Sequence, residues 1–185
     1  QGPEAEYYKL HACLKHFAIH SGPDYERHIF DVAEMSWRDL SETYLYAFER
    51  LVKTTDVKEV MCAYNAYEGK PCCGSDKLLI QILRNQWGYD GLVVTDCWAV
   101  RDFHTEGCHN LYPNDPASAS ALSVRSGADL ECGNSFPALV EAVQNGKLPE
   151  EELDRALQRV LKARFELGEM DPPRKVSWSR IHEKL

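Results

Sequence analysis

The segment YDGLVVTDCWAV (residues 89–100) contains the pattern that decides the fold. Asp90 and Gly91 form a strong turn signal, and they lead into a short, mostly β-branched apolar run at 92–94. Such a run is typical of a strand that is buried on both faces of a parallel sheet. Asp96 follows this strand at once, where a carboxylate can either cap the next helix or take part in chemistry.

The same unit of strand, loop and helix recurs along the chain, roughly every 35 residues. Ser36 with Asp39 matches a capping box, and Ser75 stands at the N-cap of a second helix. This alternation predicts an α/β fold in which helices cover a parallel sheet. The predicted strands lie at 8–17, 57–65, 91–96 and 128–133, and the predicted helices at 36–53, 76–87, 116–127, 136–146 and 149–168.

The number of predicted strands indicates part of a barrel. No G-x-G-x-x-G motif follows the first strand, so a dinucleotide-binding fold has no support. The better match is a TIM-type (β/α)8 barrel, which needs about 250 residues. Because the chain has 185 residues, we expect about half of such a barrel, with about four βα units over residues 1–170. Residues 171–185 contain two prolines and several basic residues, and are expected to be a linker-like tail.

Charge and hydropathy exclude two classes of partner. A net charge of −8 and a pI near 5.4 argue against nucleic acid, because phosphate binding needs a basic face. No apolar stretch approaches the roughly 20 residues that cross a bilayer, so no membrane span is expected. The sequence starts at QGPEAEYYKL without Met, which indicates an internal cut, and the lack of a signal peptide therefore says little about the compartment.

The seven cysteines form neither a dense disulfide scaffold nor a regular set of metal ligands. We expect them to be small buried hydrophobic residues, with a Cys62 bridge to Cys72 or Cys73 as the open alternative. The adjacent cysteines of PCCGSD differ from the spaced pairs of a zinc site. A metal protein that uses cysteines with several histidines is the weakest hypothesis, and no cofactor is expected; the histidines concerned are His11, His16, His20 and His28.

Polar side chains gather at the ends of all four predicted strands. In a barrel these ends converge on one face, which is where barrel enzymes carry their chemistry. Each residue also has a plain structural explanation: a solvated surface lysine, a partly buried histidine, a core tyrosine with a bonded hydroxyl, or a helix cap. The residues are Lys15, His16, Tyr64, Asn65, Asp96, Asp129 and Glu131.

These residue types together suit the transfer of a sugar. A carboxylate such as that of Asp96 can attack an anomeric carbon through an oxocarbenium-like transition state. Lys15 and His16 can donate to sugar hydroxyls, and the lysine charge helps to keep the nucleophile ionised. Tyr64 can donate a hydrogen bond that orients the carboxylate. The rings of Phe17 and Trp98 offer flat faces to a pyranose.

Several blocks of the sequence, in order and over nearly the whole chain, resemble the family-three glycoside hydrolases. The blocks are LKHF (14–17), VMCAYNAYEGKPCC (60–73), LLIQILRNQWGYDGLVVTDCWAV (78–100), SGADLECG (126–133) and RALQRVLKARFELGEMD (155–171). The resemblance implies the carboxyl-terminal half of a catalytic (β/α)8 barrel, with Asp96 as the nucleophile of a retaining double displacement. It also implies substrate-binding roles for Lys15, His16 and Tyr64, and for Arg27, His28, Trp98 and Glu131 in loops over the same face.

Two departures from the family pattern bear on the sugar. The block around the nucleophile usually reads Ser-Asp-Trp in this family, but here it reads Thr95-Asp96-Cys97. Together with DLECG (129–133), this form is more similar to the β-xylosidase branch. The loop HSGPDYERH (20–28) lacks the glycine-rich character that is common in β-glucosidases. Terminal β-xylosyl and β-glucosyl residues both remain open as substrates.

The resemblance implies further properties of a longer parent protein. Its acid/base residue is expected outside this chain, so the isolated chain is expected to be inactive or nearly so on natural glycosides. Enzymes of this type are commonly periplasmic or secreted. A half-barrel leaves raw sheet edges, from which we expect self-association or marginal order. The alternative function is a non-catalytic half-barrel that binds carbohydrate or has a structural role.

Overall fold

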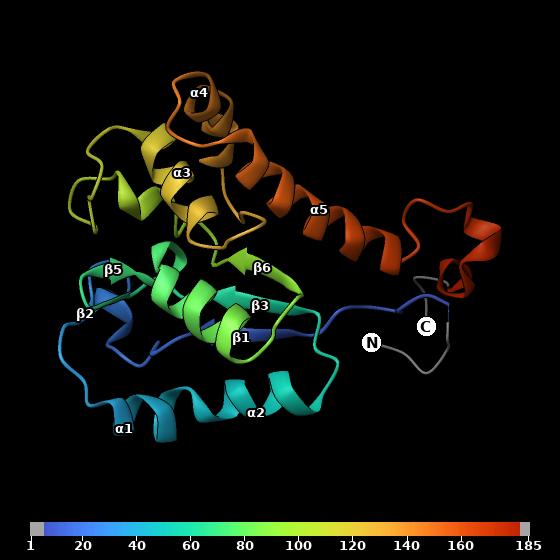
Figure 1. Ribbon diagram of the computed structural model, residues 1–185, viewed down its shortest axis with the longest axis horizontal. Coiled ribbons are helices and arrows are strands. Elements are labelled where there is room, and N and C mark those ends of the chain that lie inside the picture. The colour runs from blue at the N-terminus through green and yellow to red at the C-terminus, as the bar shows by residue number, and fades with distance from the viewer. Residues whose placement is uncertain (1–5, 182–185) are drawn as a thin grey trace.

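The computed structural model describes residues 6–181, and a parallel sheet lies at its centre (Figure 1). The sheet has the order β1-β3-β6, from β1 (Cys13–Phe17), β3 (Glu59–Cys62) and β6 (Leu92–Thr95). All four residues of β6 are buried, as the apolar run at 92–94 predicts. The three strands are shorter than the predicted ones, but each lies within its predicted segment.

The prediction of a fourth strand at 128–133 is wrong, because this segment forms only one parallel bridge, between Val94 and Leu130. The side chain of Asp129 takes the place of a ladder acceptor: its Oδ2 accepts the amide hydrogen of Val93 at 2.8 Å. Beyond Leu130 the backbone bends away, and pairing with β6 stops.

A second small sheet was not predicted. It contains β2 (Asp31–Val32), β4 (Ala66–Tyr67) and β5 (Lys70–Pro71), in the order β2-β4-β5. The antiparallel pair β4 and β5 turns through Glu68 and Gly69, whose φ angles are 51° and 75°. This is the backbone that a two-residue hairpin turn requires. Strands of two residues are too short to show the alternation by which strands are predicted.

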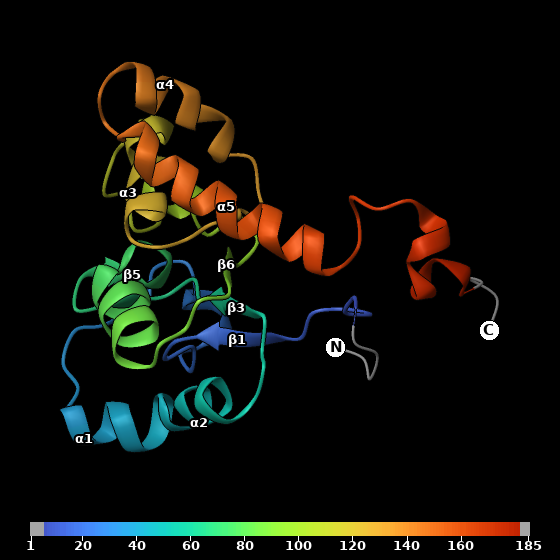
Figure 2. The same cartoon turned by 45° about the vertical axis from the view of Figure 1, so that its right-hand side comes forward.

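The helices that connect the strands pack against the same face of the parallel sheet (Figures 1 and 2), where Phe17 contacts both Phe48 and Trp87. Before β3, the segment predicted at 36–53 forms α1 (Trp37–Asp39), the π-turn η2 (Leu40–Tyr44) and α2 (Tyr46–Thr54). The Ser36 hydroxyl caps α1 by accepting the Asp39 amide hydrogen at 3.0 Å, as predicted. The other helices are the π-helix η4 (Lys77–Gln86), α3 (Pro116–Arg125), α4 (Leu139–Gln144) and α5 (Glu150–Glu166).

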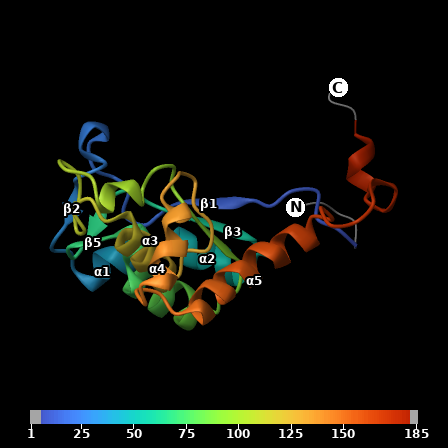
Figure 3. The ribbon, with the colours of Figure 1, turned by 90° about the horizontal axis from the view of Figure 1, so that it is seen from above.

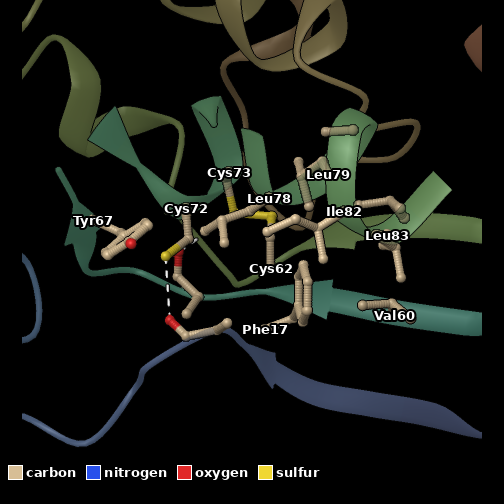
Figure 4. Packing of buried hydrophobic residues seen from close by; sticks show 14 of the residues in the cluster. Phe17, Val60, Cys62, Tyr67, Cys72, Cys73, Leu78, Leu79, Ile82 and Leu83 are labelled. Carbon is tan, nitrogen blue, oxygen red and sulfur yellow. Dashed lines mark hydrogen bonds between the residues drawn. A yellow bond between two sulfur atoms is a disulfide. The ribbon is translucent and has the colours of Figure 1, made fainter. Parts of the chain in front are cut away.

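The main hydrophobic core lies between the sheet and η4 (Figure 4). Phe17 is fully buried there and makes edge contacts with Phe48 and Trp87, so the expectation that its ring faces a sugar is wrong. Cys72 is also buried in this core, and its thiol donates to the Ala18 carbonyl at 3.3 Å. The core thus fixes the backbone just beyond β1, the strand that carries Lys15 and His16.

The segment after α5 contains two short turns, η7 (Pro173–Lys175) and η8 (Ser177–Arg180), and lies beside the start of the described chain (Figure 3). The indole Nε1 of Trp178 donates to the carbonyl of Tyr7 at 3.2 Å. The amide of Tyr8 donates to the carbonyl of Glu166 at 2.9 Å. Within residues 6–181, no helix combines the length and the apolar character needed to cross a membrane.

Candidate active site

The central feature of the candidate site is Asp96, which lies directly beyond the carboxyl end of β6. Its amide donates to the carbonyl of Cys62 at 3.0 Å, which ties it to the neighbouring strand β3. Its Oδ1 accepts the amide hydrogen of Cys97 at 2.8 Å. An N-cap side chain accepts from the second or third residue of its helix. The recorded bond goes to the next residue instead, so the helix-cap alternative for Asp96 has no support.

The other carboxylate oxygen of Asp96, Oδ2, is buried and accepts no hydrogen bond from residues 6–181. It lies 3.4 Å from Nε2 of His16, while the Asp96 side chain is 10% exposed. Burial lowers the pKa of His16, and the negative charge of Asp96 opposes this effect in part. Leaving a buried acceptor unbonded is costly, so packing alone does not explain the position of this oxygen.

Tyr64 fixes the loop that carries Asp96. Its hydroxyl donates to the carbonyl of Cys97 at 2.5 Å and also interacts with the side chain of Asp96. Burial raises the pKa of Tyr64, and the nearby charge of Asp96 raises it further, so the hydroxyl stays protonated as a donor. Tyr64 therefore orients the carboxylate through the backbone of the next residue.

Arg27 and His28 reach the site from the loop after β1, at the end of the turn η1 (Asp24–Glu26). The rings of His28 and Tyr64 pack edge to face with their centroids 4.6 Å apart, and the guanidinium of Arg27 lies 5.5 Å from the centre of the Tyr64 ring. The predicted residues Arg27, His28 and Tyr64 are thus brought together.

A buried carboxylate that the sequence did not point to, Asp102, lies behind His28. Its Oδ2 is 2.7 Å from His28 Nδ1, and Asp102 is only 4% exposed. Asp102 belongs to the turn η5 (Arg101–Phe103), which follows β6. No motif or periodicity marks it in the sequence, because the contact joins residues 74 positions apart.

A cavity of about 320 Å³ opens beside these residues. Trp98 forms part of its wall with 47% of its surface exposed, and its φ angle of 71° turns the backbone where the loop leaves β6. Arg101 also lines this cavity. An exposed aromatic ring beside hydrogen-bond donors and a carboxylate is suited to hold a sugar, because it offers an apolar face next to polar groups.

A larger hollow of about 650 Å³ lies elsewhere, over residues 33–36 with Asp39, Tyr44 and Glu68. Two of its three carboxylates have partners, because Asp39 accepts from the Ser36 hydroxyl and Glu68 pairs with Lys77, and the third, Glu34, is exposed. The cavity of about 320 Å³ is the better candidate, because its wall contains Cys97, the residue after Asp96, whose Oδ2 accepts no hydrogen bond from residues 6–181.

Three other strand-end residues, Lys15, Glu131 and Asp129, take different positions. Lys15 is exposed, and no hydrogen bond or ion pair of its ammonium is recorded among residues 6–181. Glu131 caps the next turn, because its carboxylate accepts the amide hydrogens of Ser135 and Phe136.

Asp129 does not face the site and is a structural residue. Its carboxylate pairs with Arg84 at 2.7 Å and with Arg159 at 2.9 Å, and it accepts from the Val93 amide near the middle of β6. Burial raises the pKa of Asp129, although both arginines oppose the shift, and its ion pairs explain why a carboxylate is tolerated there.

Two disulfides hold the site edge of the sheet, and the expectation that the cysteines are all unpaired is wrong. Cys62 bonds to Cys73, which confirms one of the open alternatives and rules out the Cys62–Cys72 pair. Cys97 bonds to Cys132, a pairing that the sequence did not predict. This second bond joins the residue after Asp96 to the segment that follows the Leu130 bridge.

The histidines are not arranged as metal ligands. His11 pairs with Glu59, with 3.3 Å between Nδ1 and Oε1, far from His16 and its partner Asp96. In the part of the chain that the structure describes, no group of three or more His, Cys, Asp or Glu residues could hold a metal ion.

Comparisons with known proteins identify the protein family to which the chain belongs. The family model "Glycosyl hydrolase family 3 N terminal domain" matches residues 4–163. The chain belongs to glycosyl hydrolase family 3. A xylan 1,4-β-xylosidase of Xylanibacter ruminicola is 49% identical over 184 residues, and a probable exo-1,4-β-xylosidase of Aspergillus clavatus is 39% identical over 180.

Solved structures agree with this assignment. A GH3 exo-β-xylosidase in complex with a xylobiose aziridine activity-based probe has a TM-score of 0.86 and 28% identity over 96% of this chain. A β-glucosidase from Erythrobacter marinus has a TM-score of 0.82 over 94% of it. The chain spans 21% of the Xylanibacter ruminicola protein and 23% of each of the other three.

Proposed function

We propose that this chain is the part of a retaining, exo-acting β-glycosidase that supplies the nucleophile, Asp96. The observation that carries the proposal is the buried Oδ2 of Asp96, which accepts no hydrogen bond from residues 6–181 and lies 3.4 Å from His16 Nε2. A carboxylate oxygen without an internal partner is free to form a bond to an anomeric carbon. Membership of glycosyl hydrolase family 3 supports this use.

The reaction proceeds in two displacements. In the first, Oδ2 of Asp96 bonds to the anomeric carbon while the bond to the leaving oxygen breaks, and that oxygen takes a proton from an acid outside this chain. In the second, water attacks the anomeric carbon and gives its proton to the conjugate base of that acid, while the bond to Oδ2 breaks and restores the carboxylate. The configuration at the anomeric carbon is retained because it is inverted twice.

The surrounding residues bind and orient. His16 is neutral near pH 7, since burial lowers its pKa, and it can donate a hydrogen bond to a sugar hydroxyl without forming a permanent ion pair with Asp96. Lys15, which is exposed beside it, can donate to a second hydroxyl. Tyr64 holds the Asp96 loop, and Trp98 with Arg27 and His28 lines the cavity for the leaving group.

We propose a β-xylosyl group as the preferred sugar, with β-glucosyl as the alternative. The names of the two curated relatives, both xylosidases, support the first, and the β-glucosidase neighbour supports the second. The Cys97–Cys132 bond indicates an oxidising compartment, which fits a periplasmic or secreted parent.

The chain is proposed to supply about half of a (β/α)8 barrel within a longer parent. Three parallel strands with helical cover, and an edge strand β1 that pairs only with β3, support this proposal. The isolated chain then exposes a raw sheet edge and is expected to self-associate. Analytical ultracentrifugation checks this, and a sharp compact monomer would count against it.

Covalent trapping tests the nucleophile. The parent protein is incubated with a 2-deoxy-2-fluoro β-xyloside that carries a good leaving group, digested, and searched by mass spectrometry for a fluoroxylosyl ester. The label is expected on Asp96 and absent from Asp96→Asn, while Asp90→Asn, an exposed carboxylate paired with Lys162, serves as the matched control. A label on another carboxylate contradicts the role of Asp96, and sugar binding without any label favours the non-catalytic alternative.

A further inference from the structure

The network of Asp102, His28 and Arg27 is a chain of directed hydrogen bonds, not a set of packing contacts. Arg27 Nε–H donates to His28 Nε2 at 3.1 Å. An arginine nitrogen can only donate, so His28 Nε2 must carry a lone pair. The single ring proton is therefore on Nδ1, which lies 2.7 Å from the carboxylate of Asp102.

This arrangement fixes the tautomer of His28 from behind. A carboxylate can accept but not donate when it is ionised, so Asp102 requires a proton on Nδ1 and leaves Nε2 free as an acceptor. The side chain of Asp102 is 6% exposed, whereas that of His28 is 37% exposed. Asp102 is thus fixed in place by burial, and it holds the half-exposed ring of His28.

The charged groups that face His28 are few. Arg27 and Asp102 contact its two ring nitrogens, and Tyr64 packs on the ring with its hydroxyl directed to Cys97. The thiol of Cys108 lies beside Asp102, and its pKa is raised by burial and, to a smaller extent, by the charge of Asp102. Of these groups, Asp102 is the carboxylate in contact with the ring.

We propose that Asp102 is a positioning residue of the active site, which sets the tautomer of His28 and thereby aims the guanidinium of Arg27 at the substrate. With Nε bonded to His28 and Nη1 bonded to Asp24 at 3.0 Å, the plane of Arg27 is fixed beside the ring of Tyr64 and at the wall of the cavity. Nη2 of Arg27 then remains as a donor toward a sugar hydroxyl. The inference rests on the proposed glycosidase function.

A set of variants of the parent protein tests the proposal with an aryl β-xyloside. Asp102→Leu removes the acceptor, and KM is expected to rise roughly tenfold with kcat nearly unchanged, because Arg27 binds ground state and transition state alike. Asp102→Asn keeps a neutral acceptor and should restore part of the loss. Asp90→Asn, at an exposed carboxylate that pairs with Lys162 and has no contact with Arg27 or His28, is the control, with a change in KM of less than about twofold.

A double-mutant comparison distinguishes the positioning of Arg27 by Asp102 from a general contribution of Asp102 to the fold. If Asp102 acts through Arg27, Arg27→Gln alone and Arg27→Gln with Asp102→Leu should have the same KM. Independent, multiplicative effects of the two substitutions, or a normal KM in Asp102→Leu, would overturn the proposal. If Asp102→Leu does not fold, Asp102→Asn takes its place, and its smaller rise in KM should likewise vanish when Arg27 is already Gln. Wild-type turnover decides whether the glycosidase function itself holds.

Discussion

Oδ2 of Asp96 lies 3.4 Å from Nε2 of His16, and the negative charge of Asp96 acts on the pKa of His16. These atoms come from the ends of β6 and β1, the two outer strands of the parallel sheet, with β3 between them. The contact therefore reports whether the carboxyl ends of the strands keep their relative positions.

The pKa of His16 should fall further when Asp96 is made neutral. Burial lowers this pKa below its usual value, and Asp96 is the group that raises it, so Asp96→Asn removes the opposing effect. Titration of the His16 ring by NMR in the wild type and in Asp96→Asn measures the difference. A higher pKa in the variant would contradict the electrostatic relationship.

The same shift predicts how stability depends on pH. Because the pKa of His16 is lower in the folded state, the unfolded chain binds more protons between that pKa and about 6.5. The contribution of His16 is therefore complete above about pH 6.5 and is lost as the pH falls through the folded pKa. Urea unfolding from pH 7 to 5 should show a smaller pH dependence in His16→Gln than in the wild type.

Tyr64→Phe should destabilise the protein by about 0.5–1.5 kcal/mol, because the Cys97 carbonyl loses its donor. The free energy of unfolding from urea denaturation measures this loss. Tyr25→Phe is the matched control, since Tyr25 is 84% exposed, and no change is expected there. Equal effects of the two substitutions would show that the Tyr64 hydroxyl contributes nothing.

Removal of the Cys97–Cys132 bond by a double alanine substitution should cost about 3–4 kcal/mol of stability, since the bond joins residues 35 apart in sequence. Denaturation of the oxidised proteins measures the loss. Cys13→Ala, at a free and half-buried cysteine, is the control and should cost about 1 kcal/mol or less. An unchanged midpoint in the double variant would contradict the prediction.

Asp129→Asn should cost about 3–5 kcal/mol, because it leaves Arg84, whose side chain is 8% exposed, without its buried counter-charge. Asp90→Asn breaks an exposed pair with Lys162 and should cost below about 1 kcal/mol. Thermal or urea unfolding distinguishes the two. A small effect at Asp129 would mean that the carbonyls of Gly91 and Gly127, which also accept hydrogen bonds from Arg84, are sufficient to hold its charge.

The parallel sheet could be predicted because each of its strands is a compact apolar run between clear turn signals. The hairpin of β4 and β5 could not, since strands of two residues carry no periodicity. The residues at the ends of β1 and β6 were found because strand ends share one edge of a parallel sheet. Asp102 and the partner of Cys97 depend on contacts between distant segments, which local patterns do not contain.

The Cys62–Cys73 and Cys97–Cys132 bonds both lie at the carboxyl edge of the sheet, while ion pairs such as Lys162–Asp90 and His11–Glu59 gather at the amino edge. The two ends of the strands therefore respond to different solution conditions. Salt screens the ion pairs at the amino ends, whereas a reductant breaks the disulfides at the carboxyl ends. Amide hydrogen exchange should therefore become faster at the amino ends of the three strands in high salt, and at their carboxyl ends in reductant.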